Sequence, residues 1–254
     1  MADADSVEGE PAGGAGPLTG DTGGPVVRRV VVALSFAAAA FHLYAAGVTP
    51  FTALVQRPVH LALMGTLGFI GVGLLQGREP PLAGRPRLRW GVTALLVAAT
   101  LFSCAYLAVE HEALVRRVGA VRPLDLVAGV LSIALVLELA RRTTGWGLVA
   151  VALLALVYAG AGPWLPGALA HRGYGPVRLV EHLYLTTEGI WGIPLGVSAD
   201  FVYLFILFGA VLEAAGGGTL LIALAERAAG GTRGGPAKTA SVASAFMGSL
   251  SGSA

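Results

Sequence analysis

Long, uninterrupted apolar runs dominate the chain from about residue 28 onward, in place of alternating or narrow-stripe patterns. Crossing a hydrocarbon core of ~30 Å takes about 20 apolar residues in a helix. Five runs meet this length, at about 30–49, 57–76, 90–109, 124–141 and 144–164. A sixth, at about 195–215, contains four aromatic residues. The pattern predicts an all-α, polytopic integral membrane protein with about six transmembrane helices.

The stretch between the fifth and sixth runs differs from the rest. Several prolines and glycines between residues 163 and 176 interrupt any helix. Behind them, apolar residues share one helical face and polar residues share another: Leu179, Val180, Leu183 and Tyr184 against Arg178, Glu181 and His182. This amphipathic pattern is typical of an interfacial helix, and an ordinary extramembrane loop helix fits it equally well. Trp191 is a candidate for the aromatic belt at the membrane surface.

Composition narrows the class of protein. Hydrophobic residues make up 55% of the 254 residues and charged residues only 13%, whereas a soluble domain carries roughly 25% charged residues. This excludes an ordinary cytosolic enzyme. The single cysteine, Cys104, lies in an apolar run, which favours a core position over a disulfide or a catalytic thiol. Residues 1–25 hold five acids, no base and many Gly, Pro and Ala, and we interpret them as a disordered tail.

The basic residues indicate how the chain crosses the membrane. With a cytoplasmic N-terminus, eight arginines fall in cytoplasmic segments up to the fifth span and six fall on the other side. The segment Gly216–Lys238 then also lies inside, as a basic, glycine-rich loop, which agrees with the positive-inside rule. The bases are spread over short loops, so the sequence offers no nucleic-acid patch, and we expect Arg233 and Lys238 to anchor the chain at the cytoplasmic surface.

Five polar residues in or beside the spans invite a functional interpretation. His42 and His60 lack further ligands at metal spacing and are predicted to form hydrogen bonds between helices. Glu138 precedes Arg141 and Arg142 by three and four residues, which predicts an ion pair at a helix end, with docking of two parts of the protein as the alternative. Asp200 and Glu213 flank the sixth span, where we expect hydrated, structural roles, although an intramembrane acid is a functional candidate.

Residues 235–254 consist mainly of small and hydroxyl-bearing side chains and are too polar to face lipid. The end, Gly-Ser-Leu-Ser-Gly-Ser at 248–253, is poor helix material. A short helix that ends in an unwound Gly/Ser turn presents carbonyls and hydroxyls, which are suitable ligands for a small cation, and transporters place such broken helices at ion sites. Close packing of helices through small residues is the alternative explanation.

This segment also resembles a known family. Residues 234–238 (Gly-Gly-Pro-Ala-Lys) and 246–254 (Phe-Met-Gly-Ser-Leu-Ser-Gly-Ser-Ala) closely resemble the first re-entrant hairpin in the large membrane subunit of TRAP (tripartite ATP-independent periplasmic) transporters. Residues 137–142 and 188–194 resemble the subgroup in which the small four-helix subunit is fused to the large one and paired with a TAXI-type binding protein. The resemblance covers roughly residues 28–254 and is strongest over 186–254.

The resemblance implies sodium-driven uptake of a carboxylate-bearing solute, such as an organic acid or an amino-acid-like compound. A periplasmic binding protein delivers the solute, and the permease lies in the bacterial inner membrane. No cofactor beyond the coupling sodium ion is implied. The positions that match the family's ion-binding hairpin tip are Ser249, Ser251, Gly252 and Ser253.

The predicted organisation is a tail (1–25), a small-subunit-like four-helix region (26–143) and the start of a transport domain (144–254). The last residues lie in the first arm of the hairpin, which predicts that the reading frame continues past Ala254. If it does not, the chain is a non-transporting membrane scaffold or assembly fragment. A membrane serine hydrolase is disfavoured, because Leu250 stands where a G-x-S-x-G motif needs its serine and no histidine follows His182.

Overall fold

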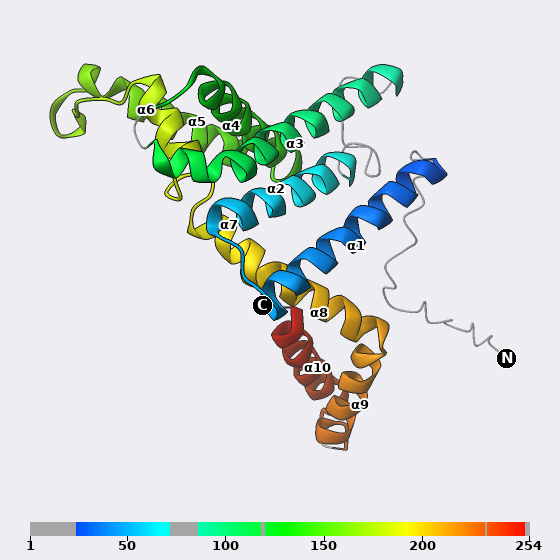
Figure 1. Cartoon of the computed structure of the whole chain (residues 1–254). Coiled ribbons are helices and arrows are strands. Elements are labelled where there is room, and N and C mark those ends of the chain that lie inside the picture. Colours follow the sequence, from blue (N-terminus) through cyan, green and yellow to red (C-terminus); the bar gives the residue numbers. More distant parts are fainter. Residues whose placement is uncertain (1–23, 72–85, 118–119, 232, 252–254) are drawn as a thin grey trace.

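The computed structural model describes residues 24–71, 86–117, 120–231 and 233–251, without the side chains of residues 86–87, 247 and 249–251. The described chain is helical and contains no strand (Figure 1). The α-helices are α1 (Pro25–Gly47), α2 (Ala53–Ile70), α3 (Pro86–Arg116), α4 (Pro123–Thr143), α5 (Trp146–Ala161), α6 (Pro176–Val180), α7 (Ile193–Val197), α8 (Tyr203–Ala214), α9 (Gly217–Ala229) and α10 (Gly235–Ser251). Short 3-10 turns η2 (Gly162–Trp164) and η3 (Gly167–Leu169) and π-helical turns η4 (Glu181–Leu185) and η5 (Ser198–Val202) lie between them.

Six helices among the described residues are long and apolar enough to cross a membrane. They cover Pro25–Gly47, Ala53–Ile70, Leu88–Arg116, Pro123–Thr143, Trp146–Trp164 and Ile193–Ala214. The last of these is built from α7, η5 and α8 in direct succession. The all-α, polytopic membrane fold and its six spans are thus confirmed. The predicted tail falls almost entirely on residues outside the described chain, and the division at residue 143 stays a prediction.

The core lies where α3 and α4 meet the segment that follows α5. Leu107, Ala128, Tyr184 and Trp191 are fully buried there. Cys104 belongs to the same cluster and is 2% exposed, which confirms its predicted core position. These side chains pack because apolar groups that are withdrawn from water into a close-packed interior stabilise a fold.

The predicted amphipathic helix is present as α6 and η4, and its apolar face packs partly against protein. Val180 and Tyr184 are buried against α4, where Gly129 leaves room for them. The Tyr184 hydroxyl donates a hydrogen bond to the Ser103 carbonyl (2.6 Å), and burial raises the pKa of this tyrosine. The hydroxyl therefore stays protonated and serves as a fixed donor.

The prediction for Trp191 was wrong. Its side chain is fully buried, and its Nε1 donates a hydrogen bond to the Tyr184 carbonyl (2.6 Å). A belt tryptophan needs contact with the headgroup region, which a buried ring cannot have. The chain turns back after η4, and this turn carries the indole into the protein core.

The predicted loop between the sixth span and the hairpin segment was also wrong. Residues Gly217–Ala229 form α9, and α10 follows it as the second arm of a helical pair that folds back toward α8 (Figure 1). Glycines at both ends of α9 suggested a loop, but the residues between them are mostly Leu, Ile and Ala, which are compatible with a helix.

A buried ion pair closes the connection between α3 and α4. Arg117 Nη1 donates to Asp125 Oδ2 (2.6 Å), and the Tyr106 hydroxyl donates to Asp125 Oδ1 (2.5 Å). The side chain of Asp125 is fully buried and that of Arg117 is 14% exposed. The hydrogen bonds to Asp125 raise the pKa of Arg117. The two helices are therefore fixed to each other at this end.

Candidate functional site

The hydroxyl-rich segment predicted to bind an ion forms α10, which packs against α9 and α8. Most of its described side chains are exposed, including Ser241. The hydroxyl of Ser241 donates to the carbonyl of Ala237 in its own helix (3.1 Å). Small, hydroxyl-bearing positions thus line a surface that the described residues leave uncovered.

Of the four predicted ion-binding residues, the structure describes the backbone of Ser249 and Ser251, at the end of this helix. The backbone of residues 248–251 continues α10, so the helix extends into the Gly/Ser end at 248–253, which was expected to be poor helix material. One turn of helix is retained there because each residue adds an intrahelical hydrogen bond, which offsets the weak propensity of Gly and Ser. The side chains of both serines, and the whole of Gly252 and Ser253, lie outside the described residues.

A second cluster of polar groups lies within the spans and joins α1 and α2 to the sixth span. His42 Nε2 and His60 Nδ1 are 2.8 Å apart, and His60 Nε2 lies 3.1 Å from the hydroxyl of Ser198. His42 Nδ1 lies 2.7 Å from the carbonyl of Ala38, and the His42 ring stacks on Tyr203 with centroids 4.1 Å apart. Both histidines are buried. The predicted hydrogen bond between helices is confirmed.

The carbonyl of Ala38 sets the direction of this chain of hydrogen bonds. A carbonyl only accepts, so His42 Nδ1 carries the proton, and in a neutral ring its Nε2 is then an acceptor. His60 Nδ1 accordingly donates to His42, and His60 Nε2 accepts from the Ser198 hydroxyl. With both rings neutral, every ring nitrogen has a partner.

Two further contacts extend this cluster along α2. Gln56 Nε2 donates to Asp200 Oδ1 (2.5 Å), and Arg57 Nη1 donates to the Trp191 carbonyl. The absence of a side chain at Gly196 leaves room for the guanidinium of Arg57. We call the whole set, which comprises Gln56, Arg57, His60, His42, Ser198 and Asp200, the polar seam.

Asp200 was expected beside the span, and this placement was wrong. It lies in η5, within the helix Ile193–Ala214, and has Gln56 as its partner. Glu213 does lie in the last turn of α8, at the end of the span. Polar groups inside a bilayer are rare because their desolvation is costly. The pair formed by Gln56 and Asp200 therefore marks a contact that the fold depends on.

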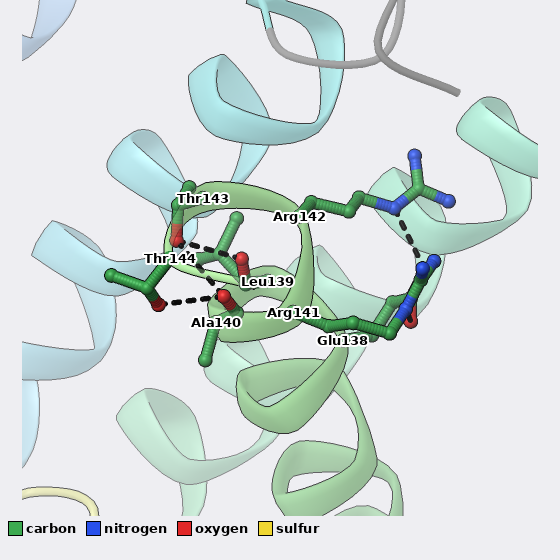
Figure 2. A network of polar contacts seen from close by, with 7 residues as sticks. All are labelled: Glu138, Leu139, Ala140, Arg141, Arg142, Thr143 and Thr144. Carbon is green, nitrogen blue, oxygen red and sulfur yellow. Dashed lines mark hydrogen bonds and ion pairs between the residues drawn. The ribbon is translucent and has the colours of Figure 1, made fainter. Parts of the chain in front are cut away.

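The charged cluster at the end of α4 has the predicted form (Figure 2). Arg141 binds Glu138 through Nε and Nη2, both at 2.7 Å, and Arg142 Nε lies 2.7 Å from Glu138 Oε1. The guanidinium of Arg141 lies over the ring of Trp146 and that of Arg142 over Phe69, at 5.6 and 5.5 Å from the centroids. The ion pair at the helix end is confirmed, and its arginines also contact α2 and α5.

Sequence reasoning did not find Gln56, Arg57 and Ser198 as members of the polar seam. Each is a polar residue within or at the start of an apolar run, and this was the available signal. Their partners are 134 to 144 residues away in the chain, so only the tertiary structure pairs them. Among the described residues, no group of three or more His, Cys, Asp or Glu side chains could hold a metal ion.

Comparison with known proteins gives a match over the part of the chain that includes α10. No curated protein and no solved structure matches the chain. Residues 131–254 match the family model described as tripartite ATP-independent periplasmic transporter, DctM component. The match begins within α4 and includes α5 to α10. Over these residues the chain is similar to the permease component of TRAP transporters.

Proposed function

We propose that the chain provides the membrane permease component of a sodium-coupled secondary transporter that imports a carboxylate-bearing solute delivered by a binding protein. The observation that carries this proposal is the family match over residues 131–254 in a chain with six helices able to span a membrane. The family model describes a periplasmic transporter component, which favours transport over an enzymatic role.

The proposed sodium ligands are Ser249, Ser251, Gly252 and Ser253. Hydroxyl and carbonyl oxygens are hard ligands that suit a small cation, and small residues let the backbone approach it closely. A cation bound there offsets the cost of bringing an anionic solute into the membrane. The backbone of Ser249 and Ser251 lies at the end of a hydroxyl-rich helix with an uncovered surface, which is compatible with this role.

The remaining parts of the proposal follow the resemblance of the sequence. The chain is proposed to be of the fused type, with its four-helix region (26–143) ahead of the transport domain. The proposed partner is a TAXI-type binding protein, and the proposed substrate is an organic acid or an amino-acid-like compound. The proposed location is the bacterial inner membrane, with the N-terminus in the cytoplasm.

The test is uptake into proteoliposomes that contain the product of the complete gene together with its binding protein. We expect uptake only with an inward sodium gradient. The double substitution Ser249→Ala/Ser251→Ala should raise the sodium concentration for half-maximal uptake by about 10-fold or more, which corresponds to about 1.4 kcal/mol. Ser241→Ala is the matched control, because its hydroxyl is satisfied within α10, and it should change this value less than about twofold.

Uptake that depends neither on sodium nor on the binding protein would contradict the proposal. A protein that retains its fold and recruits a binding protein but moves no solute would instead support a scaffold or assembly role.

A further inference from the structure

A large apolar groove opens on the membrane-spanning part of the protein, apart from the polar seam and α10. It lies between α4, α5 and the α6–η4 segment and encloses about 710 Å³. Its walls include Ile133 and Leu137 from α4 and Ala152, Ala155 and Leu156 from α5. Sites for small organic molecules typically enclose ~300–1,000 Å³ and are mostly apolar.

One end of the groove is polar and basic. Tyr174 and Arg178 line it near the end of α5, since the Tyr174 amide bonds to the Ala159 carbonyl and Arg178 lies against the Tyr174 ring. His182 also lines the groove. Arg172 extends this basic end, since its guanidinium carbon lies 6.0 Å from the Tyr174 ring centroid. The guanidinium carbon of Arg178 lies 5.8 Å from the same centroid. Two cations thus gather around one aromatic ring at the mouth of an apolar groove.

The loop after α5 is folded back so that these groups are held in place. The amide of Tyr174 donates to the Ala159 carbonyl at the end of α5 (2.9 Å), and His171 Nε2 lies 3.1 Å from the Tyr158 carbonyl. Gly173 makes the turn with φ +70°, and a Cβ there would come within 2.6 Å of the Pro163 ring. The basic end is therefore built into the fold.

No carboxylate of the described chain lies within ion-pair distance of the two arginines at the basic end. Within that part of the chain, neither Arg172 nor Arg178 has an ion pair with a carboxylate, and both residues are exposed. Basic and aromatic residues next to the end of a membrane span are well placed to meet lipid phosphates, since the stem of arginine lies along apolar surface while its head reaches the interface. An arginine also binds phosphate in a bidentate manner.

We propose that this groove is a binding site for a phospholipid, with an acyl chain between α4 and α5 and the phosphate at Arg172 and Arg178. A lipid satisfies both features at once, because the apolar walls belong to spanning helices and the cations lie at one end of them. A soluble protein docked here would need only the basic end and would leave the apolar walls of the groove without a role. This inference goes beyond the proposed transport function and does not depend on it.

The test is native mass spectrometry of the full-length protein in detergent, titrated with dioleoyl phosphatidylglycerol. We expect one tightly retained lipid. Arg178→Gln should weaken lipid binding by about 10-fold, because one charge-assisted hydrogen bond to the phosphate is lost. Arg172→Gln/Arg178→Gln should weaken lipid binding further. Arg116→Gln is the matched control, since that exposed arginine is paired with Glu112 away from the groove, and it should retain the lipid.

A second pair of variants tests the acyl-chain part without changing charge. Ala155→Phe fills the groove and should reduce lipid retention by about 10-fold or more. Leu153→Phe, an exposed position of α5 outside the groove, should not. Gel filtration and thermal unfolding of each variant confirm that it is folded.

Equal retention by all variants would overturn the proposal. Displacement of the lipid by equimolar inorganic phosphate would also overturn it and indicate a site for free phosphate. Loss of binding-protein capture with unchanged lipid retention in Arg172→Gln/Arg178→Gln would instead identify the basic end as a protein docking surface.

Discussion

His42 and His60 show how this protein accommodates polar side chains inside its spans. Each ring nitrogen has a partner, and the chain of hydrogen bonds runs from Ser198 on the sixth span through both rings to the backbone of α1. A buried polar group without a partner costs free energy, whereas removal of both partners can be nearly neutral. The pair should therefore be energetically coupled.

A double-mutant cycle tests this coupling. His42→Leu and His60→Leu should each lower the free energy of unfolding by about 1–3 kcal/mol, because each leaves polar atoms of its neighbour unsatisfied. The double variant should cost less than the sum, with a coupling energy of about 1 kcal/mol or more. The measurement is chemical unfolding in detergent. His111→Leu serves as control, because the ring of His111 bonds to the Ala108 carbonyl of its own helix. Strict additivity of His42→Leu and His60→Leu would contradict the assignment.

The polar seam also shows what single residues reveal in a sequence. The histidines were recognisable as hydrogen-bonding groups, since an imidazole within an apolar run needs a partner. Ser198, Gln56 and Asp200 were not recognisable as members of the same cluster, because contact across more than 130 positions depends on how the helices pack.

At the scale of elements, close packing decides where α6 and η4 lie. A Cβ at Gly129 would clash with Val180 Cγ1 and come within 3.2 Å of Tyr184 Cβ. Glycine thus lets α4 approach the segment that carries Trp191 into the core. The sequence showed the amphipathic pattern of this segment, but not whether lipid or protein would cover its apolar face.

Gly129→Ala should lower the free energy of unfolding by about 1–3 kcal/mol through overpacking against Val180. Gly91→Ala provides the opposite case, because it lies inside α3 with nothing within 4 Å of the place that a methyl group would take, and should be neutral or stabilising by about 0.5–1 kcal/mol. Thermal and chemical unfolding measure both. Adding Val180→Ala to Gly129→Ala should recover part of the loss; no recovery would mean that the contact is not the cause.

At the scale of the whole molecule, the span that contains α5 places the arginine pair in the last turn of α4 and the loop after α5 on opposite sides of the membrane. The positive-inside rule predicts that residues 141–144 are cytoplasmic and that residues 165–175 are outside. Each segment contains exposed residues, so labelling reagents can reach it.

Single cysteines introduced into a Cys104→Ala background test this orientation. Ala168→Cys should react with a membrane-impermeant maleimide in intact cells, and Thr144→Cys only after the membrane is permeabilised, because the reagent cannot cross the bilayer. Both positions are exposed. Removal of Cys104 avoids background labelling, as it is the only cysteine among residues 1–254. The reverse pattern would place the N-terminus outside.

The sequence by itself determined that this is an all-α membrane protein, and it located the six spans, because a helix must be apolar over its whole length to lie in lipid. It also predicted the Glu138 ion pair, which depends only on spacing along one helix. Tertiary structure decided the rest. It buried Trp191, paired Asp200 with Gln56 and joined α9 and α10 into a helical pair. These outcomes depend on which helix faces approach each other, and apolar runs in a membrane protein look alike whether lipid or protein covers them.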